Sequence, residues 1–361
     1  MGIRVGIDTG GTFTDLVAVD IDVGRWSISK VPSSPDEPVK AVDTVLAAAD
    51  LNPAEIDFIV IGTTIGINAV LTRSGSRVLF LTTQGFEDIP FIQRISRKSH
   101  YDFTWEKPTP LVHRPDCIGV AERLDEEGNA IVELTDAELD RVAAVLEATD
   151  GGGFALAVCY LFSYLNPEHE LATRQRLSRR FPGVPISLSH EVAPIWREYE
   201  RGTSAIVDAY LKPLFENYVD SLSEAFDRAG IVASWSLLKS NGGHAVAREA
   251  HARSSHLLLS GIAGGVIGGA SYARKTERPQ AIMLDMGGTS CDVCLIVDGE
   301  PLYSSDYEIE YGLPVSVPSV STKTIGAGGG SIGWIDPGGF LQVGPESAGA
   351  APRARLLRAG W

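Results

Sequence analysis

The chain has 361 residues, of which 44% are hydrophobic and 21% charged, a balance that indicates a folded globular protein and excludes a disordered chain. Its formal net charge of −15 argues against a surface for nucleic acid or for an anionic membrane. No apolar run reaches the length of a membrane span, and the first residues show no signal region, so we expect a cytoplasmic protein large enough for two domains.

The first feature along the chain is a strand that runs into a glycine turn, with the sequence IRVGIDTGGTFTD over residues 3–15. Every second residue at its start is apolar, as in a strand, and Asp8 ends that strand. The Gly10–Gly11 pair lets backbone N–H groups approach a phosphate, and a carboxylate at a strand end suits a hydrated magnesium ion. An ordinary glycine-rich hairpin has the same pattern, so this turn alone is weak evidence.

Helices and strands alternate through the next part of the chain, which favours a mixed α/β layer. The predicted elements are a helix over 38–49, a strand over 56–62, a helix over 69–73, a strand over 77–82, an irregular excursion over 94–122, a helix over 135–148, a strand over 155–161, a helix over 167–180, a strand over 186–189, a long helical region over 198–229 that is interrupted near Pro213, a strand over 234–238 and a helix that ends near residue 273. Thr135 is the expected N-cap of its helix, with Glu138 at capping-box spacing.

A second copy of the first motif follows, with the sequence AIMLDMGGTSCD over residues 281–292. Asp285 matches Asp8, the run Gly-Gly-Thr recurs, and Asp292 matches Asp15. Two phosphate hairpins far apart in the sequence predict two related domains that face each other across a nucleotide. A glycine-rich loop over residues 326–330 comes after the second hairpin.

Several other residues have two interpretations each. Thr63, Thr64 and Asn68 follow a strand end, where α/β clefts open toward substrates, but Thr63 is equally well placed to cap a helix. The glycines of residues 261–269 favour close packing of helices over contact with a ligand. Arg197 and Arg201 are spaced for a solvated ion-pair face of a helix or for binding a substrate. The four cysteines and scattered histidines show no spacing typical of disulfide frameworks or zinc sites.

On these motifs the chain resembles the N-terminal half of the hydantoinase/oxoprolinase family. The matching stretches are GIDTGGTFTD (6–15), GTTIGINAVL (62–71), REYERGTSAIVDAYLKP (197–213), SNGGH (240–244), SGIAGGVIGGA (260–270), LDMGGTSCDV (284–293), TIGAGGGSIGWID (324–336) and VGPESAGA (343–350). The resemblance implies the α/β superfold of actin, sugar kinases and heat-shock chaperones, with two actin-like ATPase domains, mixed sheets and a nucleotide cleft between them. We therefore expect a first domain over 1–190, which includes the excursion at 94–122, and a second, C-terminally truncated domain over 191–352.

The family's chemistry implies ATP-dependent ring opening of a cyclic amide, such as a hydantoin or 5-oxoproline, by phosphorylation of the amide oxygen. It also implies ATP and Mg²⁺ as cofactors, a B-type hydantoinase subunit as partner and an oligomeric assembly. Two other functions use the same hairpins: a subunit of the acetone or acetophenone carboxylase type, and a nucleotide-gated binding module without small-molecule chemistry.

The resemblance also assigns roles to individual residues. It implies that Asp8, Asp285 and Asp292 are catalytic and that Asp8 and Asp285 orient hydrated Mg²⁺. The expected nucleotide-binding residues are Thr9, Gly10, Gly11, Thr12, Thr14, Asp15, Gly287, Gly288, Thr289, Ser290, Gly326, Gly328, Gly329 and Gly330. Thr63, Thr64 and Asn68 are the expected substrate contacts. The chain departs from the family pattern at Ile61, Ile262, Ser321 and Lys323, where the family usually has His, Pro, Asp and His, so any role of those positions does not carry over.

The last nine residues, 353–361, read RARLLRAGW, where the family pattern continues as GPACYGRGG. One base inserted into a sequence that encodes APGPACYGRGG gives APRARLLRAGW, which is the end of this chain residue for residue. We therefore expect 353–361 to be an out-of-frame tail. We also expect the apolar surface around Ile325 to Val343 to be left uncovered.

Overall fold

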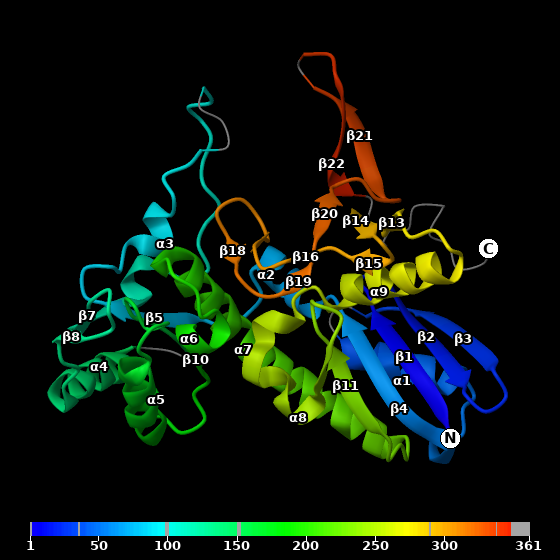
Figure 1. The fold of residues 1–361 in the computed structure, drawn as a ribbon, viewed down its shortest axis with the longest axis horizontal. Helices are drawn as coiled ribbons and strands as arrows, with labels where there is room; N and C mark the ends of the chain where they lie inside the picture. Colours follow the sequence, from blue (N-terminus) through cyan, green and yellow to red (C-terminus); the bar gives the residue numbers. More distant parts are fainter. Residues whose placement is uncertain are drawn as a thin grey trace.

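The computed structural model describes residues 2–34, 37–97, 101–149, 153–288, 290–336 and 338–347, without the side chains of Arg248, His251 and residues 345–347. These residues form a mixed α/β fold with three main sheets (Figure 1). Within the described ranges, no helix is both long and apolar enough to cross a membrane.

The largest sheet has six strands and contains the first motif at its centre. Its order is β12 (His244–Val246), β11 (Ser234–Leu238), β4 (Ile56–Thr63), β1 (Ile3–Thr9), β2 (Phe13–Asp20) and β3 (Arg25–Pro32). β4 is parallel to β1 and β11, and the other pairs are antiparallel, so the sheet is mixed as the sequence predicts. Alternate residues of β1 are buried in the main apolar core, as their period of two requires.

A second sheet of four parallel strands lies on the other side of α7 (Figure 1). Its order is β10 (Ile186–Leu188), β9 (Ala155–Cys159), β5 (Val78–Thr83) and β6 (Cys117–Val120). The prediction of an irregular excursion over 94–122 is therefore wrong at its end, because β6 pairs with β5. The three prolines before Cys117 argue against a strand in this region, so the sequence did not predict the four-residue strand β6.

The helices are α1 (Pro38–Ala48), α2 (Ile65–Thr72), α3 (Ile89–Ile92), α4 (Asp136–Ala148), α5 (Glu168–Arg180), α6 (Ser189–Val192), α7 (Glu198–Arg228), α8 (Ala247–Ala250) and α9 (Ser260–Lys275), with 3-10 turns at Pro53–Glu55, Arg114–Asp116 and His251–Leu257. Thr135 caps α4 as expected, because its hydroxyl accepts a hydrogen bond from the backbone N–H of Glu138 at 3.2 Å. The helix predicted over 69–73 starts earlier, at Ile65.

α7 is one continuous helix of 31 residues, so the interruption predicted at Pro213 is wrong. Residues on both sides of Pro213 pack into the core, and this tertiary packing outweighs the backbone hydrogen bond that proline cannot make. Arg201 lies inside the protein instead of on a solvated face. Its guanidinium donates to the carbonyl oxygens of Tyr160, at 2.8 Å, and Ile195, at 2.9 Å.

The second motif lies in a smaller sheet made of β13 (Ala281–Met286), β14 (Cys291–Val297), β15 (Glu300–Pro301) and β20 (Thr322–Ile325). α9 lies between this sheet and the six-stranded sheet (Figure 1) and covers only one face of the smaller sheet. The opposite face is apolar and accessible to solvent, with Ile282 and Leu284 at 65% and 66% exposed.

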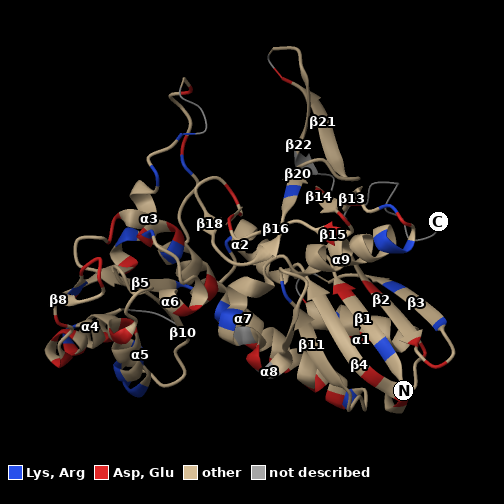
Figure 2. Cartoon of the chain, viewed as in Figure 1, with Lys and Arg blue, Asp and Glu red and all other residues tan. Residues whose placement is uncertain are grey.

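Strand pairs of two complete the structure: β7 (Arg123–Leu124) with β8 (Ala130–Val132), β16 (Tyr303–Ser304) with β19 (Ser319–Val320), β17 (Tyr307–Glu308) with β18 (Pro314–Val315), and β21 (Ser331–Ile335) with β22 (Leu341–Ser347). β21 and the start of β22 carry no charged side chain (Figure 2), and their large apolar residues are exposed, as we expect for the surface around Ile325 to Val343. The proposed tail over 353–361 lies outside the described residues.

The sheets do not follow the division that we expect near residue 190. β11 and β12 come after that residue, yet β11 pairs with β4 of the sheet that holds the first motif. The four-stranded sheet, in contrast, lies wholly before residue 190. The two-domain division stays a prediction, and strand pairing groups the chain differently from it.

Candidate functional site

The two glycine turns form the same hairpin twice. Asp8 lies directly opposite Asp15 in the β1–β2 pair, and Asp285 lies directly opposite Asp292 in the β13–β14 pair. The turns are closed by matching hydrogen bonds: the N–H of Gly10 donates to the carbonyl oxygen of Phe13 at 3.1 Å, and the N–H of Gly287 donates to that of Ser290 at 2.9 Å. A methyl group at Gly10 would lie only 3.1 Å from the same Phe13 oxygen, so a larger residue there would force the turn to shift by a few tenths of an ångström.

Helix α9 brings the two acidic pairs toward one place. A methyl group added to Gly261 would lie 3.2 Å from Oδ1 of Asp8, and one added to Gly265 would lie 3.7 Å from Oδ2 of Asp285. The first turns of α9 therefore pass against both carboxylates. Close packing is confirmed for these two glycines and for Gly264 and Gly269, but they pack against residues of strands and strand ends and not against a second helix, and nothing lies within 4 Å of a methyl group at Gly268.

The carboxylates affect one another. Water reaches part of the Asp8 side chain, but protein surrounds it on most sides, and this burial, followed by the charges of Asp15 and Asp285, raises the pKa of Asp8 to about 6 against the opposing effect of Lys30. Burial also raises the pKa of Asp292, a hydrogen bond from Thr324 lowers it, and Asp285 raises it. The four aspartates of the two hairpins therefore carry more negative charge than Lys30, the nearby cation, can balance.

This charge distribution fits a hydrated divalent cation. In the part of the chain that the structure describes, no group of three or more His, Cys, Asp or Glu side chains is arranged to enclose a metal ion. Mg²⁺ keeps several of its waters and takes only one or two carboxylates from a protein, so a three-ligand cage is not required. Asp8 and Asp285 are the residues that would hold the hydrated ion, because they come from different hairpins and the charge of Asp285 raises the pKa of Asp8.

The glycine-rich loop after β20 joins the second hairpin. The N–H of Gly329 donates to the carbonyl oxygen of Gly287 at 2.9 Å, and that of Gly330 donates to the oxygen of Gly288 at 2.7 Å. The N–H of Gly328 is bonded to the Ser331 hydroxyl at 2.8 Å. The other predicted residues of this region, Ser290 and Gly326, lie in the turn and at the start of the loop, and Thr289 lies outside the described residues.

Two residues predicted to bind nucleotide, Thr14 and Asp15, have side chains that interact with other residues of the protein. Thr14 is fully buried, and its hydroxyl is hydrogen-bonded to that of Ser33 at 2.9 Å. Asp15 is paired with the ammonium group of Lys30 at 2.8 Å. In this structure Thr14 is closed to a phosphate, and Asp15 tunes the charge of Asp8. Thr12 lies in the turn itself with its side chain half-buried.

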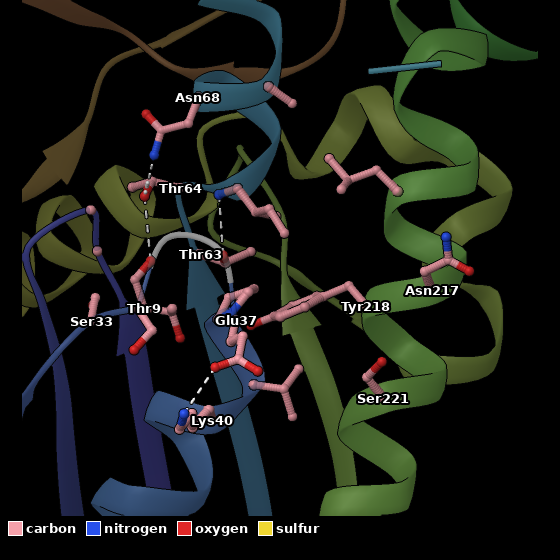
Figure 3. A pocket seen from close by; sticks show the side chains of 18 of the residues that line it. Thr9, Ser33, Glu37, Lys40, Thr63, Thr64, Asn68, Asn217, Tyr218 and Ser221 are labelled. Carbon is pink, nitrogen blue, oxygen red and sulfur yellow. Dashed lines mark hydrogen bonds and ion pairs between the residues drawn. The ribbon is translucent and has the colours of Figure 1, made fainter. Parts of the chain in front are cut away.

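An open cavity of about 1020 Å³ lies beside the first hairpin, between α1, α2 and α7 (Figure 3). The predicted substrate residues Thr63, Thr64 and Asn68 all line it, together with Thr9 and Tyr218. The Thr63 hydroxyl accepts a hydrogen bond from the N–H of Ile65, the first residue of α2, at 3.2 Å, but Thr64 occupies the N-cap position, so Thr63 supports the turn before the helix and is not its cap.

Tyr218 is a site residue that the sequence did not reveal. It comes from the middle of α7 and reaches toward Thr9 and Thr63 (Figure 3). Burial raises the pKa of its hydroxyl, while the neighbouring hydroxyls of Thr9 and Thr63 lower it. Even so, neither the Tyr218 nor the Thr9 hydroxyl has a hydrogen-bond partner of acceptable geometry among the described residues. No sequence motif marks Tyr218, which lies among the buried apolar residues of a long helix.

Comparison with known proteins places the chain in a family. The hydantoinase/oxoprolinase N-terminal region matches residues 4–181, and the hydantoinase/oxoprolinase region matches residues 201–360. The chain belongs to the hydantoinase/oxoprolinase family. Its hairpins, α9 and the glycine-rich loop all fall within the matched regions.

Relatives in this family have several activities. The chain is 34% identical over 361 residues to caprolactamase subunit alpha of Pseudomonas jessenii, covering 97% of this chain and 51% of that protein. It is 31% identical to 5-oxoprolinase 1 of Arabidopsis thaliana, covering 99% of this chain and 30% of that one. The chain thus spans about half, or less, of these relatives' length.

Solved structures of the family have the same fold as this chain. The crystal structure of the ATP-dependent caprolactamase from Pseudomonas jessenii has a TM-score of 0.82 at 31% identity, with 97% of this chain and 52% of that chain covered. The nucleotide-free structure of acetone carboxylase has a TM-score of 0.81 at 28% identity, with 96% and 51% covered. The mixed α/β fold predicted from sequence is therefore shared with an ATP-dependent caprolactamase and with acetone carboxylase, which carries out an ATP-dependent carboxylation.

Proposed function

We propose that this chain carries the ATP site of an enzyme that opens a cyclic amide. The observation that supports this most is the pair of matched hairpins, whose Asp8 and Asp285 are brought together by α9, next to a cavity of about 1020 Å³. The relative named as a caprolactamase subunit, at 34% identity, also supports a cyclic amide as the substrate. The expected actin-like arrangement, with nucleotide between the hairpins, is part of this proposal.

Each hairpin has a defined part in the proposal. ATP would supply the phosphoryl group that turns the amide oxygen into a leaving group, and Mg²⁺ would neutralise charge on the phosphates. The turn N–H groups of Gly11 and Gly288 would bind phosphate oxygens, and Gly328 to Gly330 would lie close to the nucleoside. Asp8 and Asp285 would orient the hydrated ion. Asp292 would stabilise that arrangement through Asp285, whose charge raises the pKa of Asp292.

A carboxylase-type reaction is the second candidate, because the acetone carboxylase structure matches this chain almost as well as the caprolactamase does. Both reactions place ATP in the same site and differ in the small molecule that is activated. A nucleotide-gated binding module would use the same hairpins but would have no small-molecule substrate.

Phosphate release from ATP distinguishes the three functions. The purified chain, alone and mixed with a B-type subunit, is assayed with Mg²⁺ and ATP against hydantoin, caprolactam, 5-oxoproline, and acetone with bicarbonate. We expect a cyclic amide to stimulate phosphate release by about tenfold or more, the range of ordinary differences in transition-state binding. Stimulation by acetone and bicarbonate alone would establish the carboxylase reaction. Slow turnover that no compound stimulates would establish the binding module.

We further propose that the chain acts in the cytoplasm as part of an oligomer with a B-type subunit. The caprolactamase relative is named as an alpha subunit, which indicates that it assembles with a different chain. The uncovered face of β13 and β14, with Ile282, Leu284 and Met286 at 65% to 66% exposed, is the kind of apolar surface that a partner covers.

A further inference from the structure

We propose that the cavity between the first hairpin, α1 and α7 binds an uncharged cyclic amide, whose amide group meets the hydroxyls of Thr9 and Tyr218. This inference rests on the proposed function and names the place and charge of the substrate. It depends on the two buried hydroxyls, on the apolar walls of the cavity and on the charges around it.

The floor of the cavity presents two unsatisfied polar atoms. The side chains of Thr9 and Tyr218 are 5% and 3% exposed, and neither hydroxyl has a partner of acceptable geometry among the described residues. A buried polar group without a partner costs free energy, so a ligand that supplies the missing hydrogen bonds gains affinity. Each hydroxyl can both donate and accept. A cyclic amide offers one acceptor, its carbonyl oxygen, and one donor, its N–H group, whereas a ketone offers only the acceptor.

Thr9 connects this floor to the phosphate hairpin. It is the last residue of β1, directly after Asp8 and directly before the turn glycines Gly10 and Gly11, which also line the cavity. The Thr9 side chain points to the opposite face of β1 from Asp8, because neighbouring strand residues alternate, but the cavity reaches the turn glycines whose N–H groups are proposed to bind phosphate. Proximity of this kind is the main contribution that an enzyme makes to phosphoryl transfer.

The walls of the cavity suit the methylene part of such a ring. Val39 and Leu214 approach from α1 and α7, and Ile65 and Ala69 approach from α2. A volume of about 1020 Å³ is at the upper end of small-molecule sites, so the cavity accepts a ring together with substituents or water.

The charges of the cavity select against an anion. Its lining holds two cations, Lys40 and Arg228, and three acids, Glu37, Asp43 and Glu224. Lys40 is paired with Glu37 at 2.9 Å, and Arg228 is paired with Asp43 at 3.3 Å. Within the described lining, each cation thus already faces an acid, and the acids outnumber the cations. No cation of this lining is left over to compensate a carboxylate on the ring, so 5-oxoproline should bind less well than the same ring without its carboxylate.

The test compares 2-pyrrolidinone with 5-oxoproline, because the two compounds differ only in the carboxylate. Binding to the full chain with Mg²⁺ and ATP is measured by ligand-observed NMR, together with phosphate release. We expect 2-pyrrolidinone to bind at least about tenfold more tightly, since one unfavourable charge contact is worth about that factor. Tyr218→Phe should weaken 2-pyrrolidinone binding about fivefold to tenfold, the effect of losing one hydrogen bond. Tyr272→Phe, on the exposed side of α9, is the matched control and should bind like the wild type.

The outcomes separate this inference from the proposed function. Equal or tighter binding of 5-oxoproline, with phosphate release still stimulated, would overturn the inference and leave the proposed function intact. Equal binding of 2-pyrrolidinone to the Tyr218→Phe and Tyr272→Phe variants would also overturn it. Loss of ATP binding in Tyr218→Phe would show that the nucleotide occupies the cavity instead. If neither ring binds or stimulates phosphate release while hydantoin or caprolactam does, the inference fails and the proposed function stands; if no cyclic amide stimulates phosphate release while ATP is bound, both proposals fail. Circular dichroism confirms that each variant is folded.

Discussion

The two hairpins have the same turn sequence and the same register but very different surroundings. Ile7 and Leu284 hold equivalent positions, each directly before the aspartate that ends its strand. Ile7 is 3% exposed, because β1 has a neighbour on both edges and packs in the main core. Leu284 is 66% exposed, because β13 is an edge strand and α9 covers only the other face of its sheet.

This difference shows that a local motif fixes a hairpin without fixing its environment. The glycine turn and the alternating apolar residues are enough to set the pairing of Asp8 with Asp15 and of Asp285 with Asp292. Burial depends on which other elements lie above, below and beside each strand. Four predictions test this comparison, and they are given from the largest expected effect to the smallest.

The aspartates of both hairpins should be equally indispensable despite their different surroundings. Asp8→Asn and Asp285→Asn should each reduce Mg²⁺-dependent ATP turnover by about 100-fold or more in a complete enzyme, because each removes one charge that positions the ion. Phosphate release measures this effect. Asp57→Asn and Asp298→Asn, at the far ends of β4 and of the second hairpin, are matched controls that should keep wild-type turnover. Wild-type rates in Asp8→Asn or Asp285→Asn would rule out the ATP site.

The equivalent apolar residues should differ strongly in their contribution to stability. Ile7→Ala should lower the free energy of unfolding by about 2–5 kcal/mol, because it leaves a cavity in the core. Leu284→Ala should change it by no more than about 0.5 kcal/mol, because that side chain is already in water. Urea unfolding of the two variants measures both values. A large loss in Leu284→Ala would mean that the face of β13 is covered in solution, and analytical ultracentrifugation would then identify self-association.

The raised pKa of Asp8 predicts a pH-dependent stability. The folded state holds the proton of Asp8 up to about pH 6, whereas an unfolded chain releases it near the usual value of 3.8, so ionisation of Asp8 lowers stability as pH rises between these values. In the absence of Mg²⁺, Asp8→Asn should therefore unfold at a higher temperature than the wild type above pH 6 and at nearly the same temperature near pH 4. Thermal scans across this range measure the difference. A difference that is constant with pH would contradict the prediction, and Asp57→Asn serves as the control.

The smallest effect is expected at Cys291. This residue takes the place in the second hairpin that Thr14 takes in the first, and both are buried. Cys291→Thr should therefore keep turnover within about twofold of the wild type, because the thiol packs and does not react. A variant that binds ATP but has lost phosphate release would point to a nucleophilic thiol.

The sequence by itself determined the parts of this protein that depend on neighbouring residues. The duplicated hairpins, the N-cap of α4 by Thr135 and the close-packing glycines Gly261 and Gly265 follow from turn chemistry, capping and the absence of a side chain. The mixed α/β class follows from the alternation of element types. Such features need only a few residues of context, and the chain carries that context locally.

Only the tertiary structure decided the features that depend on distant segments. α7 continues through Pro213 because packing on both sides outweighs one lost hydrogen bond. Arg201 is buried because carbonyl oxygens from other segments receive its guanidinium, where helical spacing alone also allowed a surface ion pair. Tyr218 faces the cavity because α7 crosses beside the first hairpin, more than 200 residues away along the chain. Burial and hydrogen bonding between distant residues are set by how the elements pack, and no local pattern contains that information.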